Sequence, residues 1–104
     1  MFTIPCEAIF NQHPQVYRSA LVGVGPHPQR PVIVIEPEAG YFPETRAVCD
    51  KLRRELLELG QANSLTMSIQ TVLFHRSLPV DIRHNVKIFR EKLGPWAEDE
   101  LRRS

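Results

Sequence analysis

One short run of residues constrains the fold of this chain more strongly than any other feature of its 104-residue sequence. It lies at residues 31–36, and its middle is apolar and β-branched throughout: Val32, Ile33, Val34 and Ile35. This composition and length are typical of a β-strand. A strand without polar alternation is one whose two faces are both covered by other elements. The sequence therefore predicts a sheet that is enclosed on both sides of this strand.

The segments before this strand predict a helix and a first strand. Residues 5–10 form the expected helix, with Pro5 in its first turn, and the helix ends before Pro14. Residues 16–24 have β-type composition. The connection at residues 25–30 is short and marked by Gly and Pro, which favours an antiparallel hairpin.

A second helix is expected at about residues 45–59, after a loop marked by Pro and Gly. Its apolar residues recur at steps of four, four and three: Val48, Leu52, Leu56 and Leu59. This spacing puts them on one face of a helix, and we expect that face to cover the sheet. Gly60 is the expected end of the helix.

The last part of the chain predicts a third strand, at about residues 69–75, and then a basic helix. The helix has an apolar stripe at steps of four, three and four: Ile82, Val86, Phe89 and Leu93. Trp96 is expected to close the core or to cover the end of this helix. Together the elements predict an α+β fold, with a small, three-stranded, mostly antiparallel sheet flanked by helices.

The composition fits one small globular domain at residues 1–104, with 42% hydrophobic and 24% charged residues. No apolar run approaches the roughly 18 residues that a transmembrane helix needs, so we expect a soluble protein. The net charge of +1 argues against broad attraction to nucleic acid or to a lipid surface. Only two cysteines occur and no secretory signal opens the chain, which favours a reducing, cytoplasmic location.

Several motifs suggest chemistry that their context does not support. Gly23 and Gly25 resemble part of a phosphate loop, but prolines follow where a helix N-terminus would be needed, so a hairpin turn is preferred. Glu36 and Glu38 could in principle form an acid/base pair, although a solvated strand end is expected. The histidines and cysteines lack the short spacing of a metal site, and the thiols are expected to be buried and inert.

The basic segment after the third strand holds the strongest candidate residues: Arg83, His84, Lys87, Arg90 and Lys92. Charged residues opposite an apolar stripe are usually the solvated face of a helix. Lys87, however, lies where a loop is expected to become this helix, and from there its charge could reach a phosphate. RNA binding is disfavoured because the patch has no interleaved exposed aromatic residues.

Three segments of the chain resemble one family in order and spacing. They are residues 3–9 (TIPCEAI), residues 13–23 (HPQVYRSALVG), and Leu78 and Pro79 followed by residues 87–90 (KIFR). Together they resemble the C-terminal domain of AMP-forming acyl-activating enzymes, which has a similar helix start and a Gly-Lys-Ile-x-Arg-like motif near its end. Residues 3–7 and 79–85 are similar in particular to fatty-acyl ligase relatives of olefin biosynthesis, the β-lactone synthetases.

The resemblance implies a mobile lid rather than a complete enzyme. In the family, a large N-terminal domain of the same polypeptide binds ATP, Mg²⁺ and the carboxylic acid. The small domain then brings a lysine to the α-phosphate as the acyl-adenylate forms, and Lys87 matches that lysine. Arg83, His84 or Arg90 could help to contact phosphate, while Arg90 and Lys92 are reserve candidates for the role of the lysine. No cofactor is expected to bind this domain alone.

The resemblance also implies a reaction. A β-lactone synthetase activates a β-hydroxy acid with ATP, and the hydroxyl of the acid closes a four-membered ring. The sibling interpretation is an acyl-CoA ligase, in which coenzyme A accepts the acyl group. A free-standing α+β interaction module without catalytic function is the competing interpretation from another class.

The sequence departs from the family pattern around the lysine. Val86 stands where the family has glycine, and the stretch from Pro79 to Lys87 is about two residues longer than usual. If Asp81 caps the helix, Lys87 lies inside it. If Asn85 is the cap, Lys87 lies in the first turn and is free to reach a ligand. The sequence does not decide between these two positions.

Overall fold

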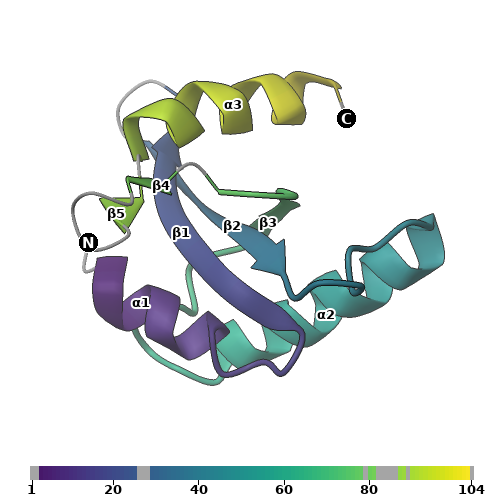
Figure 1. Cartoon of the computed structure of the whole chain (residues 1–104). Coiled ribbons are helices and arrows are strands. Elements are labelled where there is room, and N and C mark those ends of the chain that lie inside the picture. Colours follow the sequence, from purple (N-terminus) through teal and green to yellow (C-terminus); the bar gives the residue numbers. More distant parts are fainter. Residues whose placement is uncertain (1–2, 26–28, 79, 82–86, 89, 104) are drawn as a thin grey trace.

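The computed structural model describes residues 3–25, 29–78, 80–81, 87–88 and 90–103. In chain order its elements are α1 (Thr3–Phe10), β1 (Val16–Val24), β2 (Arg30–Pro37), α2 (Arg46–Gln61), β3 (Thr71–Phe74), β4 (Val80–Asp81), β5 (Lys87–Ile88) and α3 (Arg90–Arg103). The first three strands form one sheet, with α3 on one face and α1 and α2 on the other (Figure 1). The expected α+β architecture is confirmed.

The sheet has the strand order β1, β2, β3 and is mixed. β1 and β2 form the expected antiparallel hairpin, with Val22 opposite Val32. β3 lies parallel to β2, with Val72 opposite Ile33, where the sequence favoured a mostly antiparallel sheet. The reason is α2, which leads from the end of β2 back to the start of β3. A crossover of this kind joins parallel strands.

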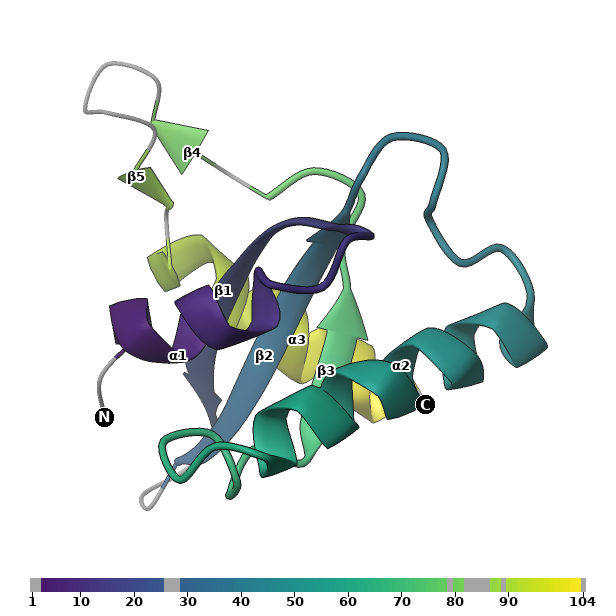
Figure 2. The same ribbon diagram turned by 90° about the horizontal axis from the view of Figure 1, so that it is seen from below.

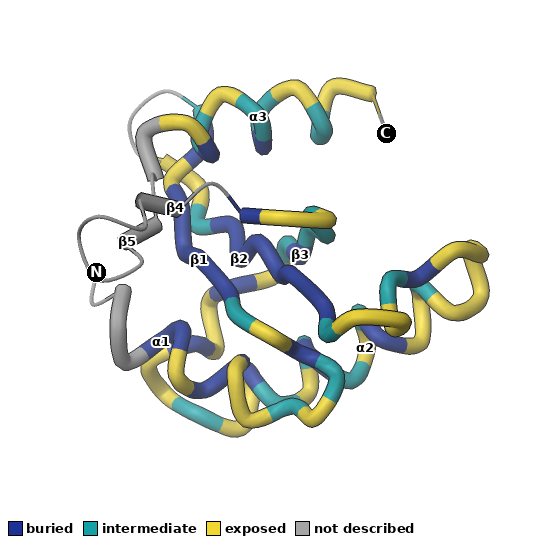
Figure 3. Tube along the Cα trace, in the orientation of Figure 1, coloured by how far each residue is buried: buried dark blue, intermediate teal, exposed yellow. Residues whose placement is uncertain are grey.

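β2 is buried along most of its length (Figure 3), as its apolar sequence predicts. Its side chains alternate between two apolar layers. The layer toward α1 and α2 contains these buried side chains of the three elements: Phe10, Ile33, Ile35 and Leu56. The layer toward α3 contains these: Val32, Val34, Leu93 and Ala97. One strand therefore joins the two layers, which is why it carries no polar alternation.

Helix α2 begins largely as its sequence predicts. Thr45 caps it, and the hydroxyl of Thr45 accepts a hydrogen bond from the N–H of Val48 at 3.2 Å. Leu52 and Leu56 are buried against the sheet, and Leu59 is half-buried, but Val48 is 50% exposed. In Figure 2 the N-terminal turns of α2 extend beyond the sheet. The predicted stripe is thus longer than the surface that it covers.

Gly60 does not end α2, contrary to the expectation from the sequence. The helix continues to Gln61, and Ala62 is its C-cap. Gly60 is buried where α2 meets α1, and a Cβ atom at this position would lie 2.8 Å from Cζ of Phe10. The glycine is therefore explained by the close approach of the two helices.

The prediction of a basic helix that begins at residue 81 or at residue 85 is wrong. β4 and β5 instead pair in an antiparallel ladder, with Asp81 opposite Lys87, and the helix begins only at Arg90. Three residues of the predicted stripe lie outside the described residues: Ile82, Val86 and Phe89. Three apolar steps are too few to distinguish one helix from a short hairpin followed by a helix.

Most of the apolar stripe of α3 comes from residues that lie beyond the predicted stripe in the sequence. Leu93 and Ala97 are buried, and Trp96 and Leu101 pack half-buried against the same layer. Pro95 lies within the helix rather than at its end. Trp96 therefore helps to close the core, as expected, but it does so from inside a helix.

Candidate functional site

The candidate lysine lies on the hairpin formed by β4 and β5, which we call the lysine hairpin (residues 80–81 and 87–88). Lys87 is in β5, and its backbone pairs with Asp81. Figure 2 shows this hairpin projecting from the body formed by the three-stranded sheet and the helices. Lys87 therefore occupies neither of the two helical positions that the sequence left open. It belongs to an extended element that stands apart from the sheet.

The other basic candidates lie at or near the same part of the chain. Arg90 is the first residue of α3, and Lys92 is exposed on the same helix. Arg83 and His84 lie outside the described residues. The described backbone thus places Lys87, Arg90 and Lys92 in succession, where the hairpin ends and α3 begins.

The N-terminal flank of the hairpin, residues 75–78, is held against the sheet. The N–H of His75 donates to the carbonyl of Ile35 at 2.8 Å, which extends the pairing of β3 with β2. The N–H of Ser77 donates to Nδ1 of His75 at 3.0 Å. The side chain of Leu78 is buried in the layer toward α3. The chain is therefore firmly positioned as far as Leu78.

Glu36 is buried, which corrects the expectation that it belongs to a solvated strand end. Its Oε1 accepts hydrogen bonds from Nε of Arg18 at 2.7 Å and from the backbone N–H of Leu78 at 2.8 Å. Only 7% of Glu36 is exposed. Arg18 lies directly opposite Glu36 in the register of β1 and β2, so its guanidinium compensates the buried charge. The hairpin register was the sequence signal that could have revealed this pair.

The ring of His75 packs against Trp96 of α3, with 4.5 Å between the ring centroids and 54° between the planes. Burial lowers the pKa of His75, and the negative charges of Glu36 and Glu100 oppose that shift. A neutral ring agrees with the hydrogen bond from Ser77, because Nδ1 accepts only when it carries no proton. The packing of His75 against Trp96 links the segment before the lysine hairpin to the helix that follows it.

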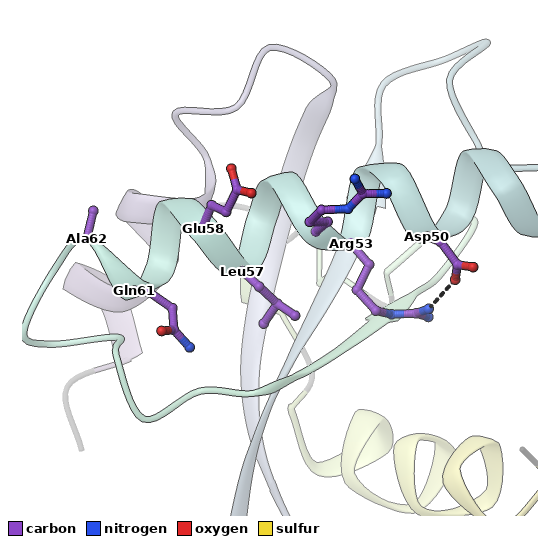
Figure 4. A pocket seen from close by; sticks show the side chains of 7 residues that line it. Asp50, Arg53, Leu57, Glu58, Gln61 and Ala62 are labelled. Atoms are coloured by element: carbon purple, nitrogen blue, oxygen red, sulfur yellow. Dashed lines mark ion pairs between the residues drawn. The ribbon is translucent and has the colours of Figure 1, made fainter.

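A hollow of about 550 Å³ lies along α2 and is lined by residues of this helix and its C-cap: Asp50, Arg53, Arg54, Leu57, Glu58, Gln61 and Ala62 (Figure 4). Arg53 is already engaged there. It pairs with Asp50 at 3.5 Å, and its Nε donates to the carbonyl of Val72 at 3.3 Å. The hydrogen bond to Val72 attaches α2 to β3, so we interpret the hollow as a consequence of helix packing.

Other chemistry finds little support within the described ranges. No group of three His, Cys, Asp or Glu side chains in these ranges could hold a metal ion. Cys6 and Cys49 are free. Cys6 is buried, as expected, and burial raises its pKa, which disfavours the thiolate form. Cys49 is only half-buried, so the expectation of a buried thiol is wrong at this position. In the same ranges, no helix has both the length and the hydrophobicity needed to cross a bilayer.

The sequence is similar to two curated proteins, while no protein-family model matches it. The olefin β-lactone synthetase of Xanthomonas campestris is 45% identical over 101 residues, which are 96% of this chain and 18% of that protein. The olefin β-lactone synthetase of Stenotrophomonas maltophilia is 40% identical over 102 residues, which are 97% of this chain and 18% of that protein. The chain thus spans less than a fifth of the length of these relatives.

Solved structures share the fold. An acyl-CoA synthetase of Brucella canis superimposes with a TM-score of 0.68 at 27% identity, covering 93% of this chain and 17% of that one. Apo MatB from Rhodopseudomonas palustris superimposes with a TM-score of 0.73 at 17% identity, covering 95% and 18%. An ATP-bound RpMatB-BxBclM chimera gives 0.75 at 18% identity, covering 94% and 19%.

These matches define the class that the chain resembles: in sequence and fold it matches the C-terminal domain of AMP-forming acyl-activating enzymes. Within this class its sequence is 40–45% identical to olefin β-lactone synthetases, which confirms the narrower resemblance as well.

Proposed function

We propose that residues 1–104 are the mobile C-terminal lid of an ATP-dependent, AMP-forming ligase that acts on a β-hydroxy fatty acid. The observation that carries the proposal is the 45% identity to an olefin β-lactone synthetase over 96% of this chain. Since the chain spans only 18% of that relative, a large N-terminal domain of the same polypeptide would bind the acid, ATP and Mg²⁺.

In this proposal Lys87 supplies positive charge to the adenylation step. The acid's carboxylate oxygen attacks the α-phosphorus of ATP, and pyrophosphate leaves with the electrons of the broken P–O bond. Negative charge accumulates on the phosphate oxygens during this exchange. An ammonium group on a long side chain can reach these oxygens from a lid and offset the charge. The position of Lys87 on a projecting hairpin supports this role.

The neighbouring basic residues have a secondary role in the proposal. Arg83, His84 and Arg90 would assist in contacting phosphate, and Arg90 or Lys92 would be the alternative source of the charge. Arg90 and Lys92 follow Lys87 at the start of α3, which supports their inclusion. ATP is abundant in the cytoplasm, and Cys6 and Cys49 are unbridged, so we also infer a cytoplasmic location.

The second half of the proposed reaction is ring closure. The β-hydroxyl of the acyl-adenylate attacks its own carbonyl carbon, AMP leaves, and the hydroxyl proton passes to a base or to water. An acyl-CoA ligase is the alternative, favoured by the likeness to the Brucella canis acyl-CoA synthetase. In that reaction the thiol of coenzyme A attacks the same carbon.

A product assay distinguishes these reactions. The full-length protein is given a β-hydroxy fatty acid and ATP, with and without coenzyme A, and the products are identified by mass spectrometry. We expect AMP, pyrophosphate and a β-lactone without coenzyme A. The matching acid without a hydroxyl is the control, and it should yield no lactone. An acyl-CoA as the main product would establish the alternative.

Failure to form AMP from any acid would contradict a ligase function and would favour a non-catalytic interaction module. The 104-residue chain alone is expected to form no acyl-adenylate, because the proposal assigns ATP and the acid to the large domain. Adenylate formation by this chain alone would contradict that assignment.

A further inference from the structure

We propose that Glu36 is a positioning residue for the adenylation reaction, because its carboxylate fixes the point from which the lysine hairpin leaves the core. The inference rests on the proposed function, since it concerns the placement of Lys87. Glu36 does not act on substrate in this proposal. It acts through the backbone of Leu78, which lies two residues before β4.

Glu36 holds two donors at short distances. One of its oxygens receives both of them, Nε of Arg18 at 2.7 Å and the N–H of Leu78 at 2.8 Å. The side chains of Arg18 and Glu36 are 22% and 10% exposed, so solvent competes weakly for the carboxylate. Nε of Arg18 and the N–H of Leu78 can both donate to a side-chain oxygen at this position, whether it belongs to a carboxylate or to an amide. The acceptor for Leu78 is therefore held in place from the opposite strand.

The hydrogen bond from Leu78 to Glu36 positions the backbone that leads into the lysine hairpin. Leu78 has left the β3 ladder, and its N–H is bonded to a side chain rather than to a strand. Without Glu36 that buried N–H would lose its acceptor, which is unfavourable away from water. The backbone could recover a partner only by moving, and the chain that follows would move with it. Glu36 thus fixes the N-terminal flank of the hairpin.

Glu36 is not a member of either apolar layer, so its role differs from that of the core residues. The apolar layers are formed by other residues, and Glu36 lies near the end of β2, beyond their apolar run. α3 holds the C-terminal flank independently, through Leu93 and Ala97. Loss of the Glu36 contact should therefore displace the hairpin while the fold persists. Misplacing a catalytic group by about 1 Å can cost about 10²-fold in rate.

Two substitutions of Glu36 distinguish the effect of its side-chain length from the effect of its charge. Glu36→Gln keeps an oxygen at the same reach but removes the charge, whereas Glu36→Asp keeps the charge but shortens the side chain. If Glu36 acts by placing Leu78, Gln should retain most of the activity and Asp should lose about 10- to 100-fold in rate. The measurement is the rate of pyrophosphate release by the full-length protein at saturating ATP and β-hydroxy acid. Glu98→Ala, which breaks the exposed pair with Arg102 in the last turns of α3, is the matched control and should leave the rate unchanged.

A double-mutant cycle tests whether the effect passes through the lysine. Glu36→Asp is combined with Lys87→Ala, and melting temperatures confirm that each variant is folded. We expect the double variant to be as slow as Lys87→Ala alone, because a lysine that is absent cannot be misplaced. A merely structural role would lower the rate by the same factor in both backgrounds.

The outcomes separate the two proposals. If Lys87→Ala is slow but Glu36→Asp is as active as the unmodified protein, or its effect is additive, the role of Glu36 is overturned and that of Lys87 stands. An active Glu36→Asp variant together with an inactive Glu36→Gln variant would also overturn the role of Glu36, since the charge of the side chain would then matter rather than its length. A Lys87→Ala variant of normal rate would overturn the proposed function of Lys87 and this inference together.

Discussion

At the scale of single residues, His75 couples the stability of the fold to pH. Its ring is packed against Trp96, and burial lowers its pKa below the ordinary value of about 6.5. As the pH falls below that value, the unfolded chain binds a proton before the folded chain does. The stability that the neutral ring contributes is thus present above about pH 6.5 and is lost as the pH falls toward the lower folded pKa.

We predict that His75→Asn removes this part of the pH dependence. Asn places an oxygen where Nδ1 of His75 accepts the N–H of Ser77, but it does not titrate. Urea unfolding of the 104-residue chain at pH 7.5 and at pH 5.5 measures the effect. The unmodified chain should lose more stability between these pH values than the variant. Equal losses would contradict the assignment of a neutral, buried His75.

At the scale of elements, the contact between α1 and α2 explains Gly60, which the sequence suggested was a helix end. Replacing glycine by alanine inside a helix normally adds up to about 1 kcal/mol of stability. Here the new Cβ would lie 2.8 Å from Phe10, so we predict that Gly60→Ala destabilises the chain by about 1–3 kcal/mol. Denaturant unfolding measures the change.

The partner substitution provides the control for this contact. Phe10→Leu shortens the side chain that Gly60 faces, so adding it to Gly60→Ala should cost less than adding it to the unmodified chain. A Gly60→Ala variant more stable than the unmodified chain would show that the helices do not approach as closely as described.

The elements also show how far the sequence could predict this fold. β1, β2 and α2 were predicted nearly to their bounds, because a continuous apolar strand and a stripe over about three turns are strong local patterns. The parallel pairing of β3 depends on where α2 returns the chain, which no local pattern states. The lysine hairpin was mistaken for a helix because β4 and β5 are two residues each, too short to show alternation.

At the scale of the whole molecule, the candidate site combines one predicted residue with one that local reasoning missed. Lys87 was predicted from its resemblance to a family motif and stays a prediction, although the helix expected around it was wrong. Glu36 looked like part of a wet strand end, because its partners Arg18 and Leu78 are far away in the sequence. Such a contact follows from strand register and from the return of the chain across the sheet.

In the molecule as a whole, residues 75–78 and α3 are held against the sheet, and the lysine hairpin lies between them in the chain. Single-turnover pyrophosphate release from the full-length protein, at saturating ATP and β-hydroxy acid, tests the role of Lys87. We predict that Lys87→Ala slows this step by about 10²- to 10³-fold with an unchanged melting temperature. Lys51→Ala, which removes an exposed lysine of α2, should leave the rate unchanged. A Lys87→Ala protein that releases pyrophosphate at nearly the unmodified rate would contradict the account.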